Sequence, residues 1–238
     1  MESGCYLVIN NVAEEDIPKI ENSLQRRGLI GQSRLTYENT MELLIIKFTP
    51  GPAHGLTGRV FFYEIASKIR AVPGHTSSSA LPVGAAKFGV PGERSKQGDE
   101  GFIPRTRTKD DWPSVMLEVG YAECLPYLRQ DASWWLIHSA GQTRMVLIFR
   151  ITRGPFSLRI EVWELAPNPR RVTRTGRAIA PRSTAALDID AAGTVTPPNA
   201  LRIPYQAIFD NPHQNSSDIL LSPDELSECA LAIFRALG

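Results

Sequence analysis

Two carboxylates, Asp99 and Glu118, have the surroundings in this sequence that most clearly predict chemistry. Glu118 interrupts the apolar run at residues 115–119, and a glutamate is rarely buried in a strand without a partner. Alternation along a strand places Glu118 on the same face as Gly120. Asp99 lies in a polar loop upstream, and the chain between them is long enough to return and bring it beside Glu118. Two carboxylates on adjacent strands would suit Mg²⁺, which takes one or two protein carboxylates together with substrate phosphate.

Both carboxylates also have ordinary structural explanations. A buried glutamate can pair with an arginine or cap a neighbouring loop. Aspartate is common in loops because its side chain stabilises turns. A loop aspartate followed by a buried glutamate is therefore a weak signal by itself, and on spacing alone the two explanations stay open.

Composition limits the class of protein. The chain has 238 residues, of which 42% are hydrophobic, and this is enough apolar material for one substantial core. The formal net charge of +1 argues against a generally basic nucleic-acid coat, so a charged partner must be met by a local patch. The 3 cysteines are far apart and form no CxxC pair, which favours a reducing compartment and an intracellular protein, cytoplasmic or nuclear. We expect neither a secretory leader nor a membrane span.

Several common catalytic motifs are absent from the sequence. There is no GxxxxGK[ST] phosphate loop, no GxGxxG after a strand, no GxSxG elbow and no HExxH helix. Nucleotide hydrolysis on a phosphate loop, dinucleotide cofactors, hydrolase triads and zincin chemistry are therefore not expected. The 4 histidines are widely spaced and have no ligand-like partner, so surface or capping roles are favoured over metal binding.

The elements that must position the two carboxylates alternate between strands and helices. Apolar residues three and four apart predict a helix over 57–70. Pro126 suits the first turn of a second helix, which Gly141 ends, and Ser222 is a good N-cap for a last helix. Short apolar or alternating runs predict strands, at residues 5–9, 41–48, 115–119, 145–151 and 156–165.

We therefore expect an α/β fold with a central mixed sheet flanked by helices. The stretch 71–111 mixes weak strand signals with loops, and the stretch 166–200 has no period and is expected to be a loop or arm. Residues 201–209 are expected to hold a short strand. The expected organisation is one domain in three parts: an N-terminal strand–helix extension (1–40), a core (41–165), and a basic loop with a C-terminal strand and helix packed on the core (166–238).

Three stretches together resemble a known family. They are Asp111-Trp-Pro-Ser-Val-Met-Leu-Glu-Val-Gly-Tyr-Ala-Glu-Cys-Leu, then Leu128-Arg-Gln-Asp-Ala-Ser-Trp-Trp-Leu, and Gln142-Thr-Arg-Met-Val-Leu-Ile. They are similar to the restriction-endonuclease-like proteins of fungi and to the Uma2-like branch of the PD-(D/E)XK nuclease superfamily. The similarity covers roughly residues 40–165.

The resemblance implies a restriction-endonuclease-like sheet and a nuclease activity that uses Mg²⁺ or Mn²⁺. In such proteins an aspartate at the start of one strand and a glutamate on the next bind the metal, which corresponds to Asp99 and Glu118. A lysine two residues after the glutamate would assist, but Gly120 stands there. Arg129 and Lys96 are the candidates for a relocated cation. The alternative is a degenerate nuclease fold that acts as a binding or interaction module.

A nucleic-acid partner, DNA or RNA, is also consistent with a locally basic segment. Residues 144–182 hold nine arginines and two glutamates, so this segment could meet a phosphate backbone. The candidate phosphate contacts are Arg170, Arg171, Arg174 and Arg177. A solvated loop whose arginines pair with acidic residues elsewhere is the competing explanation. Trp134 and Trp135 stand at helical spacing and are expected to be core residues rather than stacking platforms for bases.

Overall fold

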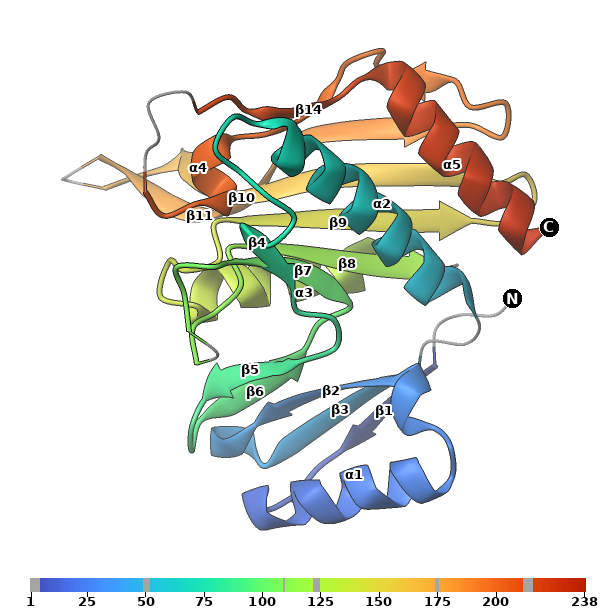
Figure 1. The fold of residues 1–238 in the computed structure, drawn as a ribbon. Coiled ribbons are helices and arrows are strands. Elements are labelled where there is room, and N and C mark those ends of the chain that lie inside the picture. The colour runs from blue at the N-terminus through green and yellow to red at the C-terminus, as the bar shows by residue number, and fades with distance from the viewer. Residues whose placement is uncertain (1–4, 49–51, 109, 122–124, 174–175, 212–215) are drawn as a thin grey trace.

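A computed structural model of the chain describes residues 5–48, 52–108, 110–121, 125–173, 176–211 and 216–238. The described residues form two units, an upper one around a large sheet and a lower one around a small sheet (Figure 1). The helices and strands are β1 (Cys5–Ile9), α1 (Ile17–Arg26), β2 (Ser33–Glu38), β3 (Leu43–Phe48), α2 (Pro52–Ala71), β4 (Ala80–Pro82), β5 (Lys87–Val90), β6 (Arg94–Gln97), β7 (Glu100–Pro104), β8 (Val115–Tyr121), α3 (Leu125–His138), β9 (Met145–Thr152), β10 (Ser157–Thr173), β11 (Gly176–Ile189), β12 (Val195–Thr196), β13 (Leu201–Ile203), α4 (Tyr205–Ile208), β14 (Ile219–Leu221) and α5 (Pro223–Leu237).

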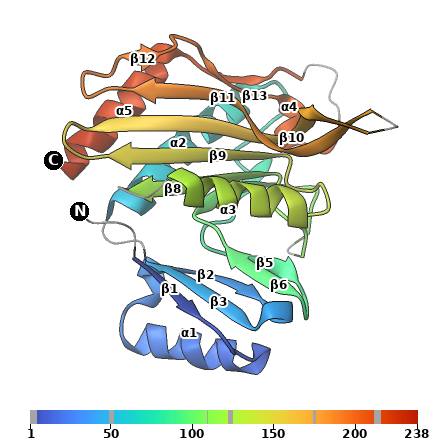
Figure 2. The ribbon, with the colours of Figure 1, turned by 180° about the vertical axis from the view of Figure 1, so that it is seen from behind.

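The large sheet has seven strands in the order β12-β11-β10-β9-β8-β7-β4. Neighbouring strands in this sheet run antiparallel, except β8 and β9, which run parallel and are joined by α3. Helices α2 and α5 cover one face, and α3 covers the other, as the views from the front and from behind show (Figures 1 and 2). Strand β8 is apolar on both faces because it packs on α2 through Leu117 and Val119 and on α3 through Met116.

The small sheet has five strands in the order β1-β3-β2-β6-β5. Helix α1 covers one of its faces, where Ile17 and Leu24 pack against Leu35 and Leu44. Since successive strand residues point to opposite faces, Arg34 and its alternate neighbours on β2 point away from α1. This second face of the small sheet is turned toward α3 and the start of β7.

Several expectations from the sequence are confirmed. The fold is mixed α/β, with sheets and helices combined around a large mixed sheet. The strand expected at 115–119 is β8, and the helix after Pro126 is α3. Ser222 caps α5: its hydroxyl oxygen accepts from the Glu225 amide at 3.3 Å, and the Glu225 carboxylate accepts from the Ser222 amide at 2.8 Å. No helix of the described residues has both the length and the apolar content to cross a membrane.

The boundary expected between residues 40 and 41 does not coincide with a structural one. Strand β3 follows it in sequence but lies between β1 and β2 in the small sheet. Strands β5 and β6, from the stretch expected to be largely irregular, complete that sheet. They were missed because each is only four residues long and lies between turns.

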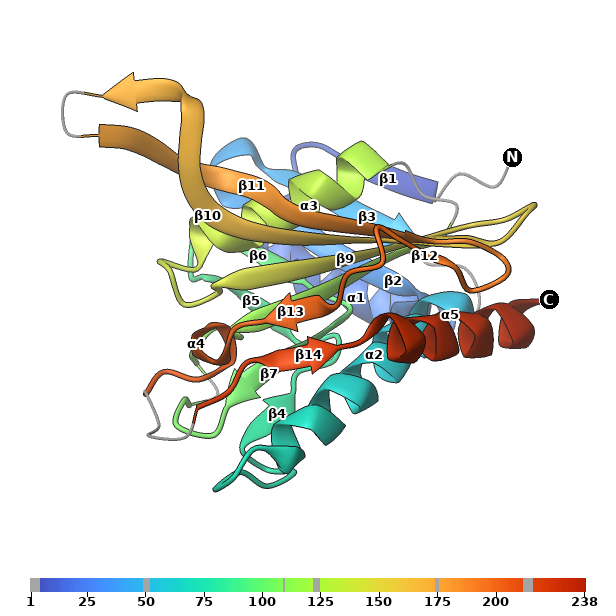
Figure 3. The same cartoon turned by 90° about the horizontal axis from the view of Figure 1, so that it is seen from above.

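The prediction of a loop over 166–200 is wrong for most of that stretch. Strand β10 continues to Thr173, and β11 pairs with it from Gly176, so the two strands form a long arm that projects from the sheet (Figure 3). The sequence pattern does not predict this arm, because prolines and small polar residues interrupt the alternation of apolar and polar residues along both strands. The candidate phosphate contacts Arg170, Arg171, Arg174 and Arg177 have side chains outside the described residues, so their role stays a prediction. Residues 201–209 hold the short strand β13 followed by the one-turn helix α4.

Candidate active site

The structure brings Asp99 and Glu118 together where β7 begins beside β8, on the side of the large sheet that faces the small one. Asp99 immediately precedes β7, which pairs antiparallel with β8 so that Glu100 lies opposite Leu117. Continuing this register by one residue places Asp99 opposite Glu118. Asp99 Oδ2 accepts a hydrogen bond from the Val119 amide at 2.9 Å, which fixes the aspartate on β8. The chain return expected from the sequence is therefore present.

Glu118 is a buried carboxylate whose environment favours its neutral form. Its side chain is 2% exposed, and its Oε1 accepts a hydrogen bond from Trp135 Nε1 at 2.5 Å. Burial, followed by the negative charge of Asp99, raises the pKa of Glu118 to about 8, against the opposing influence of Lys96. The protein without a bound cation therefore holds a proton on Glu118 at neutral pH. Trp135 is buried, as expected for a core residue, and it also orients the glutamate.

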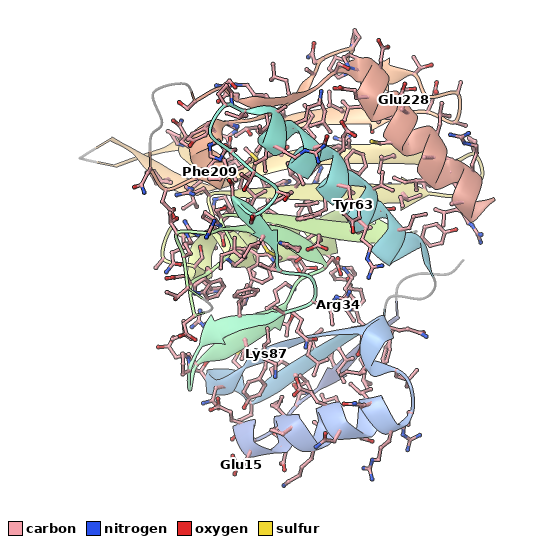
Figure 4. The ribbon with its side chains drawn as sticks, in the orientation of Figure 1. Glu15, Arg34, Tyr63, Lys87, Phe209 and Glu228 are labelled. Atoms are coloured by element: carbon pink, nitrogen blue, oxygen red, sulfur yellow. The ribbon has the colours of Figure 1, made fainter. Side chains whose placement is uncertain are left out.

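Arg34 neutralises Asp99 from the small sheet. Its Nε lies 3.0 Å from Asp99 Oδ1, and the two side chains are 13% and 3% exposed. Figure 4 shows Arg34 where the small sheet faces the large one. No pattern in the sequence signals this contact, because an arginine that alternates with apolar residues on a strand normally points to solvent.

Two buried lysines share one aspartate next to Glu118. Lys96 Nζ lies 2.6 Å from Asp131 Oδ1 on α3 and donates to Thr36 Oγ1 at 3.2 Å. Lys47 Nζ lies 3.7 Å from Asp131 Oδ2. Burial alone would lower the pKa of Lys96, but the charges of Asp131 and Glu118 outweigh it and raise that pKa, so Lys96 stays protonated. Of these residues, sequence reasoning selected only Lys96 and Glu118.

Lys47 and Asp131 were missed for different reasons. Lys47 stands near the end of an apolar run, where a lysine usually marks the exposed end of a strand. Its Nζ instead donates to the Val119 carbonyl at 3.5 Å, on the peptide bond that precedes Gly120. Asp131 lies beside the apolar stripe of α3, and its polar character alone predicts only a solvated flank.

Arg129 does not join this group, so its expected role as the relocated cation is corrected. Its guanidinium donates to both oxygens of Glu161 on β10, at 3.0 and 2.7 Å. Arg159 and Trp163 donate to the same carboxylate, at 2.8 and 2.9 Å. Burial alone would raise the pKa of Glu161, but these hydrogen bonds outweigh it and lower that pKa to about 2. Arg129 therefore serves to compensate a buried glutamate on the far side of β9.

Two cavities meet at the carboxylates. The Asp99 cavity, of about 370 Å³, is lined by Asp99, Arg59 and several glycines. The Glu118 cavity, of about 330 Å³, lies between the small sheet and α3, and its polar lining includes Glu118, Asp131 and both buried lysines. Arg34 and Gln97 line both cavities, so the ion pair between Arg34 and Asp99 stands at their junction.

The carboxylate oxygens of Asp99 and Glu118 are the kind of ligand atom that a hard divalent cation such as Mg²⁺ prefers. Among the described residues there is no group of three or more His, Cys, Asp or Glu side chains arranged to hold a metal. Mg²⁺ nevertheless needs only one or two protein carboxylates, and it takes the rest of its oxygen ligands from water and phosphate. Asp99 and Glu118 would supply that pair, and a cation there would share Asp99 with the guanidinium of Arg34. A cation at this position would replace the proton on Glu118.

Comparison with known proteins assigns the chain to no family. A scan against protein-family models finds no matching family, and a search of curated proteins finds no matching relative.

Proposed function

We propose that the protein is a metal-dependent nuclease of the PD-(D/E)XK type, which hydrolyses phosphodiester bonds in nucleic acid with Mg²⁺ or Mn²⁺ at Asp99 and Glu118. One observation carries the proposal. An aspartate at the start of one strand lies across from a buried glutamate on the next strand, with two buried lysines beside them. This is the residue pattern that the resemblance to the superfamily implies, apart from the origin of the lysines.

The surrounding elements support a restriction-endonuclease-like core. Helix α2 precedes β7 and β8, the strands that carry the carboxylates, and packs on β8. Strands β7 and β8 form the antiparallel pair that presents Asp99 and Glu118, and α3 connects β8 to its parallel neighbour β9. The small sheet supplies Arg34, Lys47 and Lys96 to the same place.

Each residue has a role that follows from its contacts. Asp99 and Glu118 would hold the metal, which supplies a Lewis acid for the phosphate and lowers the pKa of a bound water. Lys96 would offset the charge that develops on the attacked phosphate, because it is protonated and lies within electrostatic reach of Glu118. Lys47 reaches the carbonyl beside Gly120 and so brings an ammonium to the part of β8 where the family's lysine would stand.

A catalytically inactive binding fold is the second candidate, and a specific observation favours it. Asp99 is held by Arg34 and by the Val119 amide, and Glu118 is held by Trp135. In this interpretation the carboxylates are structural, and Arg34 takes the place of the metal.

The test measures metal binding and cleavage on the same samples. Calorimetry follows Mg²⁺ and Mn²⁺ binding, and gels follow the cleavage of single-stranded DNA, duplex DNA and RNA. We expect Asp99→Asn and Glu118→Gln to lose metal binding and cleavage. Lys96→Met should retain metal binding but cleave at least about 100-fold more slowly, since it removes charge stabilisation in the transition state.

Arg129→Ala is the matched control, because Arg129 lies on the same helix as Asp131 but contacts only Glu161 among the ion pairs of the described residues. It should cleave like the wild type. Wild-type protein that binds neither metal and cleaves none of the three substrates would refute the nuclease and favour the binding fold. Circular dichroism on each variant ensures that a loss of activity is not a loss of structure.

A further inference from the structure

Much of the Glu118 cavity is apolar, and hydrolysis at the carboxylates makes no use of that surface. One wall comes from the small sheet and includes Val8, Leu43 and Ile45, and the opposite wall is the flank of α3 that carries Tyr127 and Trp134. A polar cluster of Glu118, Asp131 and both buried lysines lies where the cavity meets β8, and Glu38 and Gln130 also line the cavity. A ligand that fills this space therefore has an apolar body and a polar end directed at Glu118.

The apolar walls present aromatic rings that are already held in place. The rings of Tyr6 and Tyr127 lie with their centroids 5.0 Å apart at 46°, so they join β1 to the first turn of α3. Trp134 Nε1 donates to Glu38 Oε1 at 3.0 Å, and its ring packs edge-on against Trp135 at 5.2 Å. Tyr127 is still 49% exposed. Rings fixed in this way lose little conformational entropy when a flat ligand stacks on them.

The size of the cavity limits what can enter. Its volume of about 330 Å³ is at the lower end of the range of small-molecule sites, about 300–1,000 Å³. It has room for one planar ring system and is too small for a base pair with its backbone. A base in a duplex would have to leave the helix to reach it.

The Asp99 cavity offers a path for the phosphates on either side of such a base. Arg59 supplies a positive charge there beside Arg34, which is paired with Asp99. Glu100 also lines this cavity, but its carboxylate accepts from the backbone amides of Gly84 and Gly101. At Gly31 and Gly55 an added Cβ would meet nothing within 4 Å, so these positions leave the cavity open beside the backbone. Because Arg34 lines both cavities, a chain with a phosphate at Asp99 can place its next base in the Glu118 cavity.

We infer that the Glu118 cavity receives one unpaired nucleobase, so that the preferred substrate is single-stranded nucleic acid; this inference rests on the nuclease activity proposed above. The base stacks on the aromatic wall beside Tyr127, and its phosphate lies at Asp99 and Glu118. Stacking on aromatic side chains accepts every base, so the inference includes no sequence preference.

The experiment measures binding without turnover. Fluorescence anisotropy in EDTA gives the Kd of the full chain for three labelled probes: the 12-mer (dT)12, the duplex (dT)12·(dA)12, and a 12-mer of the same length with abasic residues. The variants are Tyr127→Ala and, as the matched control, Tyr63→Ala. Tyr63 is likewise a helix tyrosine, 69% exposed, but it lies on α2 away from the cavity (Figure 4).

We expect (dT)12 to bind more tightly than either the duplex or the abasic strand. Tyr127→Ala should weaken the binding of (dT)12 by about 5- to 150-fold, the range for one base stack. Tyr127→Ala should leave the affinity for the abasic strand unchanged. Tyr63→Ala should change the affinity for neither (dT)12 nor the abasic strand. A duplex that binds as tightly as (dT)12, or a Tyr127→Ala variant with unchanged affinity for (dT)12, would overturn the inference.

The failure of this inference and the failure of the nuclease proposal give different results. Cleavage with Mg²⁺ together with equal affinity for (dT)12 and the abasic strand would overturn only the base pocket. Tighter, Tyr127-dependent binding of (dT)12 without cleavage in either metal would support the pocket and overturn only the catalysis.

Discussion

The proton on Glu118 makes the stability of the metal-free protein depend on pH in a way that one substitution can isolate. The perturbation is Glu118→Gln, which keeps the volume of the side chain and removes its titration. The pKa of Glu118 is raised to about 8 in the folded protein, against an ordinary value of 4.5. Below about pH 4.5 the folded and unfolded chains both hold the proton, so this group contributes no pH dependence.

Between about pH 4.5 and 8 the unfolded chain has lost the proton while the folded protein still binds it. The free energy of unfolding therefore falls as the pH rises, and above about pH 8 the loss is complete. At about 1.4 kcal/mol per pH unit, the loss amounts to at most about 5 kcal/mol. The glutamine variant lacks this proton, so its free energy of unfolding relative to the wild type should increase by a few kcal/mol across the same interval.

The assay is urea denaturation of both proteins in EDTA, at half-unit steps from pH 5 to pH 9. Asp99→Asn gives an internal check, because the charge of Asp99 is one cause of the raised pKa of Glu118. In that variant the fall in stability should end at a lower pH and be smaller, because the pKa of Glu118 in the folded protein is raised less. Parallel curves for the wild type and Glu118→Gln would refute the reasoning, since they would mean that Glu118 titrates alike in the folded and unfolded chains.

Three further predictions concern other parts of the chain. Glu161→Gln should lower the free energy of unfolding by about 3–5 kcal/mol, because two arginines lose their buried partner. Arg129→Ala should lower it by less, about 1–2 kcal/mol, because Arg129 is 41% exposed and Arg159 still pairs with Glu161. Equal losses in urea denaturation would contradict this difference. Gly55→Leu should leave the melting temperature unchanged or raise it, since leucine favours a helix and its Cβ meets open space. The same substitution should weaken the binding of single-stranded oligonucleotides, because it narrows the Asp99 cavity. Unchanged affinity would show that this cavity is not part of the binding path. Ser222→Ala should lower stability by about 0.5–2 kcal/mol through loss of the cap of α5, and thermal denaturation with no shift would show that the cap contributes nothing.

Local patterns in the sequence determined the most apolar elements of the large sheet, the cap of α5 and one half of the site. Residues 115–119 predict β8 because a run that is apolar on both faces requires layers on both sides, and α2 and α3 provide them. Glu118 was identifiable as unusual because a carboxylate in such a run must be compensated. The cap at Ser222 is likewise a local signal, since all its atoms lie within four residues.

Tertiary structure alone decided which side chains complete the site. Helix α3 has two polar flanks beside its apolar stripe, one with Arg129 and one with Asp131, and the stripe predicts that both flanks exist without saying what each one faces. Packing turned the Asp131 flank toward the small sheet and the Arg129 flank toward Glu161. Arg34 and Lys47 come from strands more than sixty residues before their partners Asp99 and Asp131. Such contacts depend on how the two sheets are placed against each other, and no pattern within one element contains that information.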